Sequence, residues 1–268
     1  MGRFWKMGAV AAALLLVQAG GALAAAQPAR LEGKPNLNGI WQVMNGANWN
    51  LEPHEARTAL VAEDKLGAIG AVPAGLGVVE GGVIPYLPAA REQRETNRKS
   101  APGADPEAAC YLPGIPRANY MDHAFQIIQG GAGDLLVAYE YASANRVIHM
   151  QKAEAPPIDT WMGTSYGSWE GDTLKVVTLG QNGRTWLDRA GDYLSPTGTV
   201  TERFKLKDPD HITYEATIED PAVYSRPWKI SMPLYRQTEP NAQLLEFNCV
   251  PFAELLLYGD LLANKDAK

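Results

Sequence analysis

The sequence has no long apolar run beyond its first residues and no cluster of basic residues. A helix that spans a bilayer needs about 20 apolar residues, and no segment after residue 24 is apolar enough to form one. Phosphate backbones are bound by clustered Lys and Arg, whereas this chain carries a formal net charge of −6. We therefore expect no membrane span in the mature chain and no nucleic-acid partner.

Motifs for common cofactors are also missing. The four histidines show neither H-x-H nor H-E-x-x-H spacing and have no cysteine at zinc-site spacing. No Gly-rich phosphate loop follows a predicted strand. We expect neither a metal site nor a nucleotide cofactor.

The N-terminus has the pattern of an export signal. Arg3 and Lys6 precede an apolar run over 7–17, and Ala22-Leu23-Ala24, an A-x-A pattern, follows before the first polar stretch. We predict a signal peptide over residues 1–24. The mature chain, residues 25–268, is then periplasmic or secreted and forms one domain.

Cysteine is scarce: the chain has only Cys110 and Cys249. An oxidising compartment would let the two thiols join, so we predict a disulfide between them. Two buried free thiols are the alternative, because pairing cannot be deduced from sequence alone.

The order of short patterned segments predicts an all-β fold. Leu37–Met44 reads as a first strand, and a stretch broken by Gly and Pro follows it, so residues 25–122 should hold this strand and a wrapping segment. Within that segment, Pro88–Lys99 is predicted to be a short charged helix. Residues 123–268 then contain nine runs rich in β-branched and aromatic residues: 123–129, 134–141, 145–151, 163–169, 173–178, 199–206, 212–219, 227–235 and 243–249.

Strands in this number without intervening helices favour an antiparallel meander that closes into a barrel, which hides its edges. The helical spacing of Pro251–Ala263 predicts a C-terminal helix packed across the outside. We expect such a barrel to hold one small ligand.

Two motifs resemble those of lipocalin-like (calycin) barrels. Gly39-Ile40-Trp41 matches the lipocalin G-x-W, and "SWEGDTLKV" is similar to the W-x-G-D-T-L hairpin. The resemblance implies a calycin-like barrel in which a basic residue, Arg226 or Arg236, packs across Trp41.

Over most of its length the mature chain also resembles a large, mostly uncharacterised family of exported soil bacterial proteins. The similar text includes "DPEAACYLPGIPR", "DTWMGTSYGSWEGDTLKVVT", "TWLDRAG" and "YEATIEDPAVYSRPWKISMPLY". One position departs from the family pattern, because Leu194 stands where relatives have histidine. The resemblance therefore implies no mechanism for this chain that needs a histidine at position 194.

The hairpin "LLVAYEYASANRVIHMQ" suggests an acid–base pair. If Ala142–Asn145 is the turn, Tyr141 pairs with Arg146, and Glu140 and His149 become diagonal neighbours on one face. On an interior face, Glu140 would orient His149 as a general base, because imidazole titrates near pH 6.5. The alternative is that this face points to solvent.

The long connection from Leu179 to Thr197 is predicted to be a functional lid. Trp186 could stack on an aromatic ligand, and Arg189 could offer its planar fork to a carboxylate or phenolate, oriented by Asp188. Alternatively, Asp188 and Arg189 pair with each other and pin the loop to the barrel.

Further aromatic and histidine residues are candidates for ligand contacts, namely Tyr139, Trp161 and His54. "GTSYG" also matches G-x-S-x-G, with Asp188 and His211 following in hydrolase order. A nucleophile elbow needs a strand before the serine and a helix after it, whereas another strand is predicted here. A serine hydrolase is therefore the least favoured interpretation.

Two functional hypotheses remain. In the first, the barrel performs cofactor-free acid–base chemistry on an apolar or aromatic, lignin-like molecule as a lyase, dehydratase or isomerase. His149 is then the base, Glu140 its orienter, and Arg189 the residue that stabilises developing negative charge. In the second, the protein is a non-catalytic periplasmic carrier or sensor of such a ligand.

Overall fold

The computed structural model describes residues 29–56, 71–101, 103–131, 133–253 and 256–257. The predicted signal peptide (1–24) lies outside these residues, and so does most of the predicted C-terminal helix over 251–263. Within the described ranges, no helix is both long and apolar enough to cross a membrane.

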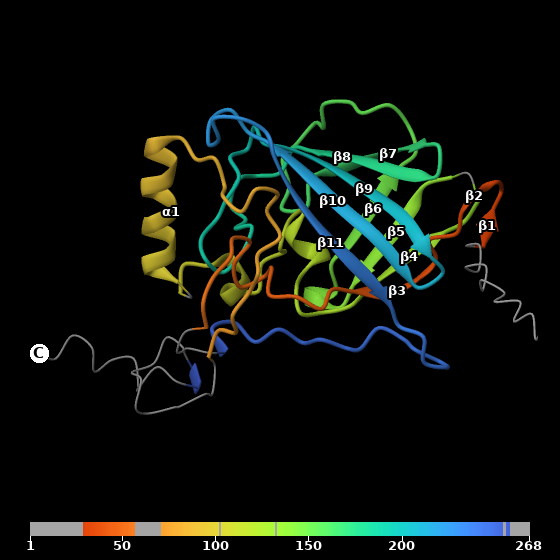
Figure 1. The fold of residues 1–268 in the computed structure, drawn as a ribbon, viewed down its shortest axis with the longest axis horizontal. Helices are drawn as coiled ribbons and strands as arrows, with labels where there is room; N and C mark the ends of the chain where they lie inside the picture. The colour runs from red at the N-terminus through yellow and green to blue at the C-terminus, as the bar shows by residue number, and fades with distance from the viewer. Residues whose placement is uncertain (1–28, 57–70, 102, 132, 254–255, 258–268) are drawn as a thin grey trace, which may run out of the picture.

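Nine strands of the described chain close into one barrel (Figure 1). They are β3 (Gly39–Gln42), β4 (Phe125–Gln129), β5 (Leu135–Tyr139), β6 (Asn145–His149), β7 (Thr164–Glu170), β8 (Thr173–Leu179), β9 (Thr199–Asp208), β10 (His211–Glu219) and β11 (Trp228–Arg236). Strand β3 lies between β11 and β4, so an early strand closes the sheet. The all-β barrel is confirmed, although β6 and β7 pair in parallel and the meander is not wholly antiparallel.

The barrel core follows from the alternation of side chains along each strand. On β10, Ile212, Tyr214, Ala216 and Ile218 are buried, while the residues between them are more exposed. Because successive strand residues point to opposite faces, this period places one set inside the barrel. Full burial of each Ile or Leu side chain stabilises the fold by about 1.5–3 kcal/mol.

The remaining elements are short and lie around the barrel. They are the small sheet of β1 (Arg30–Leu31) and β2 (Lys34–Pro35), helix α1 (Pro88–Ser100), and the 3₁₀ turns η1 (Pro106–Ala109), η2 (Arg117–Asn119) and η3 (Tyr141–Ser143). The predicted charged helix is confirmed as α1, with proline in its first turn. Figure 1 shows α1 on the side of the barrel away from β1 and β2.

Eight of the nine strands predicted after residue 123 are present, and the prediction for Gln243–Cys249 is wrong. The described barrel is already closed by β11 against β3, which leaves no edge in it for another strand. The chain after β11 instead runs back beneath the barrel as an extended tail (Figure 1). There, the backbone N–H of Leu245 donates to the Glu140 carboxylate at 2.8 Å.

The G-x-W motif has a specific role in barrel closure. Arg236 lies over the Trp41 ring at 4.2 Å, while the Trp41 indole donates to the Leu37 carbonyl. Of the two basic residues proposed for this contact, Arg236 is therefore the one that makes it. Gly39 is required because its φ is +145° and because a Cβ there would lie 2.0 Å from Arg236 Nη1.

Candidate functional site

A polar network occupies part of the barrel interior. Arg146 on β6 pairs with Glu202 on β9 and also donates to Ser165 (2.6 Å) and Thr178 (3.0 Å), and all four residues are buried. Asn119 donates to Glu202 at 2.6 Å. A buried ion pair needs such extra hydrogen bonds to offset its desolvation. The network therefore ties the adjacent strands β6 to β9 together through satisfied polar groups.

Tyrosines extend the network. The Tyr214 hydroxyl donates to Glu202 at 3.0 Å, and the Tyr139 hydroxyl donates to Asn119 at 2.9 Å. Burial raises the pKa of Tyr139 to about 12, so this phenol is neutral. Tyr139, predicted to contact a ligand, is thus engaged with Asn119 inside the barrel.

Ser165 does not form a nucleophile elbow. It lies within β7, and its hydroxyl accepts from Arg146 and bonds to Thr178 at 3.0 Å. His211, the proposed triad base, pairs instead with Asp208 at 2.7 Å. The serine-hydrolase interpretation therefore lacks the strand–turn–helix context that it requires.

The predicted pairing of Glu140 with His149 is wrong. In the hairpin, Leu136 pairs with Val147 and Ala138 with Asn145, so the register differs from the predicted one. The cause is η3, which takes Glu140 out of the strand. His149 instead contacts Asp134 at 2.8 Å on the exposed rim, where hydrogen bonds from the Met150 backbone and His149 lower the pKa of Asp134.

Glu140 does approach a histidine, but a different one. Its Oε2 lies 3.9 Å from His123 Nδ1 and accepts from the Ala124 backbone at 3.1 Å. The His123 ring packs against Phe247 of the tail with centroids 4.3 Å apart, and Tyr141 lies 5.4 Å from the same Phe247 ring. An imidazole with an adjacent carboxylate thus stands in an aromatic surround.

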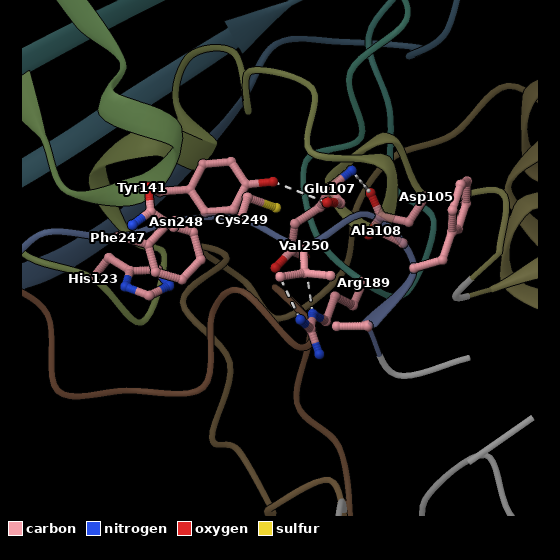
Figure 2. A pocket seen from close by; sticks show the side chains of 12 residues that line it. Asp105, Glu107, Ala108, His123, Tyr141, Arg189, Phe247, Asn248, Cys249 and Val250 are labelled. Atoms are coloured by element: carbon pink, nitrogen blue, oxygen red, sulfur yellow. Dashed lines mark hydrogen bonds and ion pairs between the residues drawn. The ribbon is translucent and has the colours of Figure 1, made fainter. Parts of the chain in front are cut away.

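These rings form one wall of a pocket of about 350 Å³ (Figure 2). The other walls come from η1 and its cap, from the connection between β8 and β9, and from the tail, and no lining residue lies within a strand. The lining residues are Asp105, Glu107, Ala108, His123, Tyr141, Arg189, Phe247, Asn248, Cys249, Val250, Phe252 and Ala253. The volume suits a small organic ligand.

Arg189 lines this pocket, as Figure 2 shows, and Glu107 orients it. Arg189 donates through Nε and Nη2 to the two Glu107 oxygens, each at 2.9 Å, and its guanidinium lies 4.4 Å from the Trp49 ring. Burial alone would raise the pKa of Glu107, but Arg117 and Arg189 hold it below its usual range. Glu107 is therefore ionised and fixes the arginine fork.

Asp188 does not orient Arg189, so both predicted roles for an Asp188–Arg189 pair are wrong. Asp188 is fully buried and accepts backbone N–H groups from Leu51 and Ala190, each at 2.9 Å. Trp186 is also buried, and its backbone forms a bridge with Tyr193. Buried residues thus anchor the segment 180–198 in the structure. Of the three residues predicted to act in this segment, Trp186, Asp188 and Arg189, it is Arg189 that lines the pocket.

The two remaining predicted ligand contacts lie elsewhere. Trp161 stacks on Tyr111, with ring centroids 4.5 Å apart. His54 pairs with Gly75, and its ring nitrogens lie 3.0 Å from the carbonyl oxygens of Glu52 and Pro73. The structure therefore distributes the predicted site residues over several places.

The disulfide between Cys110 and Cys249 is confirmed, with Cα atoms 5.8 Å apart. It joins the end of η1 to the tail, which places Phe247 and Asn248 at the pocket. The predicted pairing of these cysteines already implied that "DPEAAC" and "LLEFNC" meet, so this sequence signal pointed to the pocket. Disulfides persist in oxidising compartments.

Comparisons with known proteins add no name to this geometry. No protein-family model matches the chain, and neither a curated protein nor a solved structure matches it significantly. Among the described residues, no group of three or more His, Cys, Asp or Glu is placed to hold a metal ion.

Proposed function

We propose that this exported protein binds a small apolar or aromatic molecule in the pocket beside His123 and moves a proton on it without a cofactor. The observation that carries the proposal is the position of His123, whose imidazole lines the pocket with the Glu140 carboxylate at Nδ1. Imidazole is the side chain that most often transfers protons near neutral pH.

The aromatic surround supports this ligand class. Phe247 and Tyr141 offer ring faces, and Val250 and Phe252 add apolar surface to the same walls. Aromatic ligands stack on such faces with a gain of about 0.5–1.5 kcal/mol beyond area burial. The ligand should therefore carry a flat apolar part and an acidic C–H or O–H directed at His123.

The chemical roles follow from the contacts. His123 takes the proton, and Glu140 stabilises the imidazolium that forms. At 3.9 Å the two groups are too far apart for a hydrogen bond, and catalytic contacts of this kind commonly tighten when substrate binds. Arg189 is held by Glu107, so it offers its positive charge through space to the developing anion. The reaction class is a lyase, dehydratase or isomerase.

A carrier or sensor in the periplasm is the second candidate. Its support is that polar groups of the pocket already have partners: Tyr141 donates to the Glu107 carbonyl at 2.9 Å, and Arg189 donates to the Glu107 carboxylate. Polar groups that are already hydrogen-bonded within the protein favour binding of a ligand over its chemical conversion.

The test is mass spectrometry of aromatic candidates incubated with the purified mature protein and with two matched variants. His123→Gln should abolish a time-dependent product while the compound still co-elutes with the protein. His149→Gln serves as control, because this histidine lies on the exposed rim with Asp134. Unchanged turnover in His123→Gln would reject the base assignment. An isomer keeps the mass of its substrate, so each compound is also followed by its chromatographic retention time. Retention of a compound in the unaltered protein with no change in mass or in retention time would make the protein a carrier.

A further inference from the structure

Two aspartates are buried side by side beneath α1. Asp188 and Asp192 belong to the connection between β8 and β9, and both have no solvent exposure. An isolated buried carboxylate is costly, so such groups are paired, hydrogen-bonded or neutral. The proposed function uses neither residue.

Three of the four carboxyl oxygens of Asp188 and Asp192 accept hydrogen bonds from described residues. Asp188 Oδ1 accepts the backbone N–H groups of Ala190 and Asp192, and its Oδ2 accepts that of Leu51. Asp192 Oδ1 accepts from the Tyr86 hydroxyl at 2.8 Å and from Arg94 Nε at 3.1 Å. Asp192 Oδ2 is buried and has no hydrogen-bond donor among the described residues.

The charges facing the pair do not neutralise two carboxylates. Arg94 of α1 is the cation in direct contact, and it also lies near Glu52 at 3.9 Å and Glu95 at 2.8 Å. Arg117 of η2 is bound to Asp105 and Glu107. Among the described residues, phenols also face the pair: Tyr86 before α1, Tyr120 directly after η2, and Tyr224 after β10.

We infer that Asp188 and Asp192 share one proton, which supplies the missing donor at Asp192 Oδ2. The protonated pair then fastens this loop to α1, and the strength of this attachment depends on pH. Burial, the charge of Asp192 and a carboxyl-to-carboxyl hydrogen bond raise the pKa of Asp188 well above its usual value. Like charges in one site cannot both ionise cheaply, so one proton stays between them.

The aspartate pair connects α1 to the loop that carries Arg189. Arg94 holds Asp192, and Asn97 donates to the Gly191 carbonyl at 3.0 Å. Gly191 has a φ of +91°, and a Cβ there would lie 2.7 Å from Asn97 Cβ, so the helix rests directly on the loop. Loss of the shared proton at alkaline pH places two negative charges under this contact and weakens it.

The direction of the pH effect follows from linkage. The pKa of Asp188 is raised in the folded state, so its contribution to stability is fully present below the unfolded pKa of about 4 and is lost as pH rises through the folded pKa. Between the unfolded and the folded pKa, the shared proton is bound in the folded state and is released on unfolding. The unfolding equilibrium constant therefore gains a factor of about ten per pH unit from this pair.

Asp192→Asn is the sharpest test. The amide oxygen can still accept from Tyr86 and Arg94, and the amide nitrogen can donate to Asp188 in place of the shared proton. The ratio of the unfolding constants of wild type and variant, measured by denaturant titration from pH 5 to 9, should rise by up to about tenfold per pH unit. Asp220→Asn is the control: that buried carboxylate already accepts Ser195 and Ala222 donors, so the amide should destabilise without this pH trend.

A ratio that does not change with pH would overturn the inference, and so would a ratio that depends on added cations instead of pH. If Asp192→Asn does not fold, infrared spectroscopy of the wild type decides. The carbonyl band of a protonated carboxyl group should persist at pH 7 and vanish at alkaline pH with loss of the α1 contact. A spectrum at pH 7 without that band would reject a shared proton.

Discussion

Breaking the ion pair inside the barrel should cost a large part of the stability of the protein. Glu202→Gln leaves the Arg146 guanidinium buried without its counter-charge. Arg146→Met leaves Glu202 with the neutral donors Asn119 and Tyr214 and without its cation. Removal of one partner of a buried pair costs about 3–5 kcal/mol, against a total stability of about 5–15 kcal/mol for typical domains. Each single variant should therefore be strongly destabilised.

The double variant should be much less destabilised than the sum of the two single variants. The amide oxygen that Glu202→Gln introduces can still accept from Asn119 and Tyr214, and neither member of the pair then carries an uncompensated charge inside the barrel. We expect a coupling energy of about 2–3 kcal/mol, the upper range for residues in contact. Guanidinium titration with a common m value gives the free energies of unfolding. Single-variant losses below about 1 kcal/mol, or losses that add, would refute the assignment of the network as a structural tie.

Two further predictions concern the tail and the barrel closure. Replacing both cysteines by alanine removes a cross-link between residues 139 positions apart, and should lower the free energy of unfolding by about 2–5 kcal/mol. Chymotrypsin should then cut at Phe247 sooner than in wild type, and equal cutting rates would contradict the tethering role. Gly39→Ala should lower the free energy of unfolding by about 1–3 kcal/mol, because it combines a φ of +145° with a clash against Arg236. The denaturation midpoint measures this loss, and Ile40→Val, a small change at the buried neighbouring residue, is the control.

The local patterns of the sequence were sufficient to predict most of the fold. Alternating β-branched and aromatic residues predicted β4 to β11, and the charged run with its leading proline predicted α1. The parallel pairing of β6 with β7 was not predictable in this way, because pairing partners are set by the whole barrel and not by either strand. The segment 243–249 has strand-like composition, but the closed barrel offers it no edge to pair with.

The candidate site was harder to predict, for a physical reason that Glu140 illustrates. A single 3₁₀ turn, η3, changed the hairpin register, so Glu140 left the strand and came to lie beside His123 instead of His149. Arg146 and Glu202 each looked like an ordinary strand residue, and only closure of the barrel brings them together. The pairing of Cys110 with Cys249 was the long-range contact at the pocket that the sequence itself indicated.

The barrel and the pocket built from loops depend differently on the disulfide. The barrel strands are held by their own hydrogen-bonded ladder and by the Arg146–Glu202 network, neither of which involves the tail. The pocket, in contrast, lies between η1 and a tail whose described residues 237–250 form no regular strand and are fastened by the disulfide and by isolated hydrogen bonds such as that from Leu245 to Glu140. Reduction should therefore open the pocket before it unfolds the barrel, because local segments with few contacts separate at lower free energy than the core.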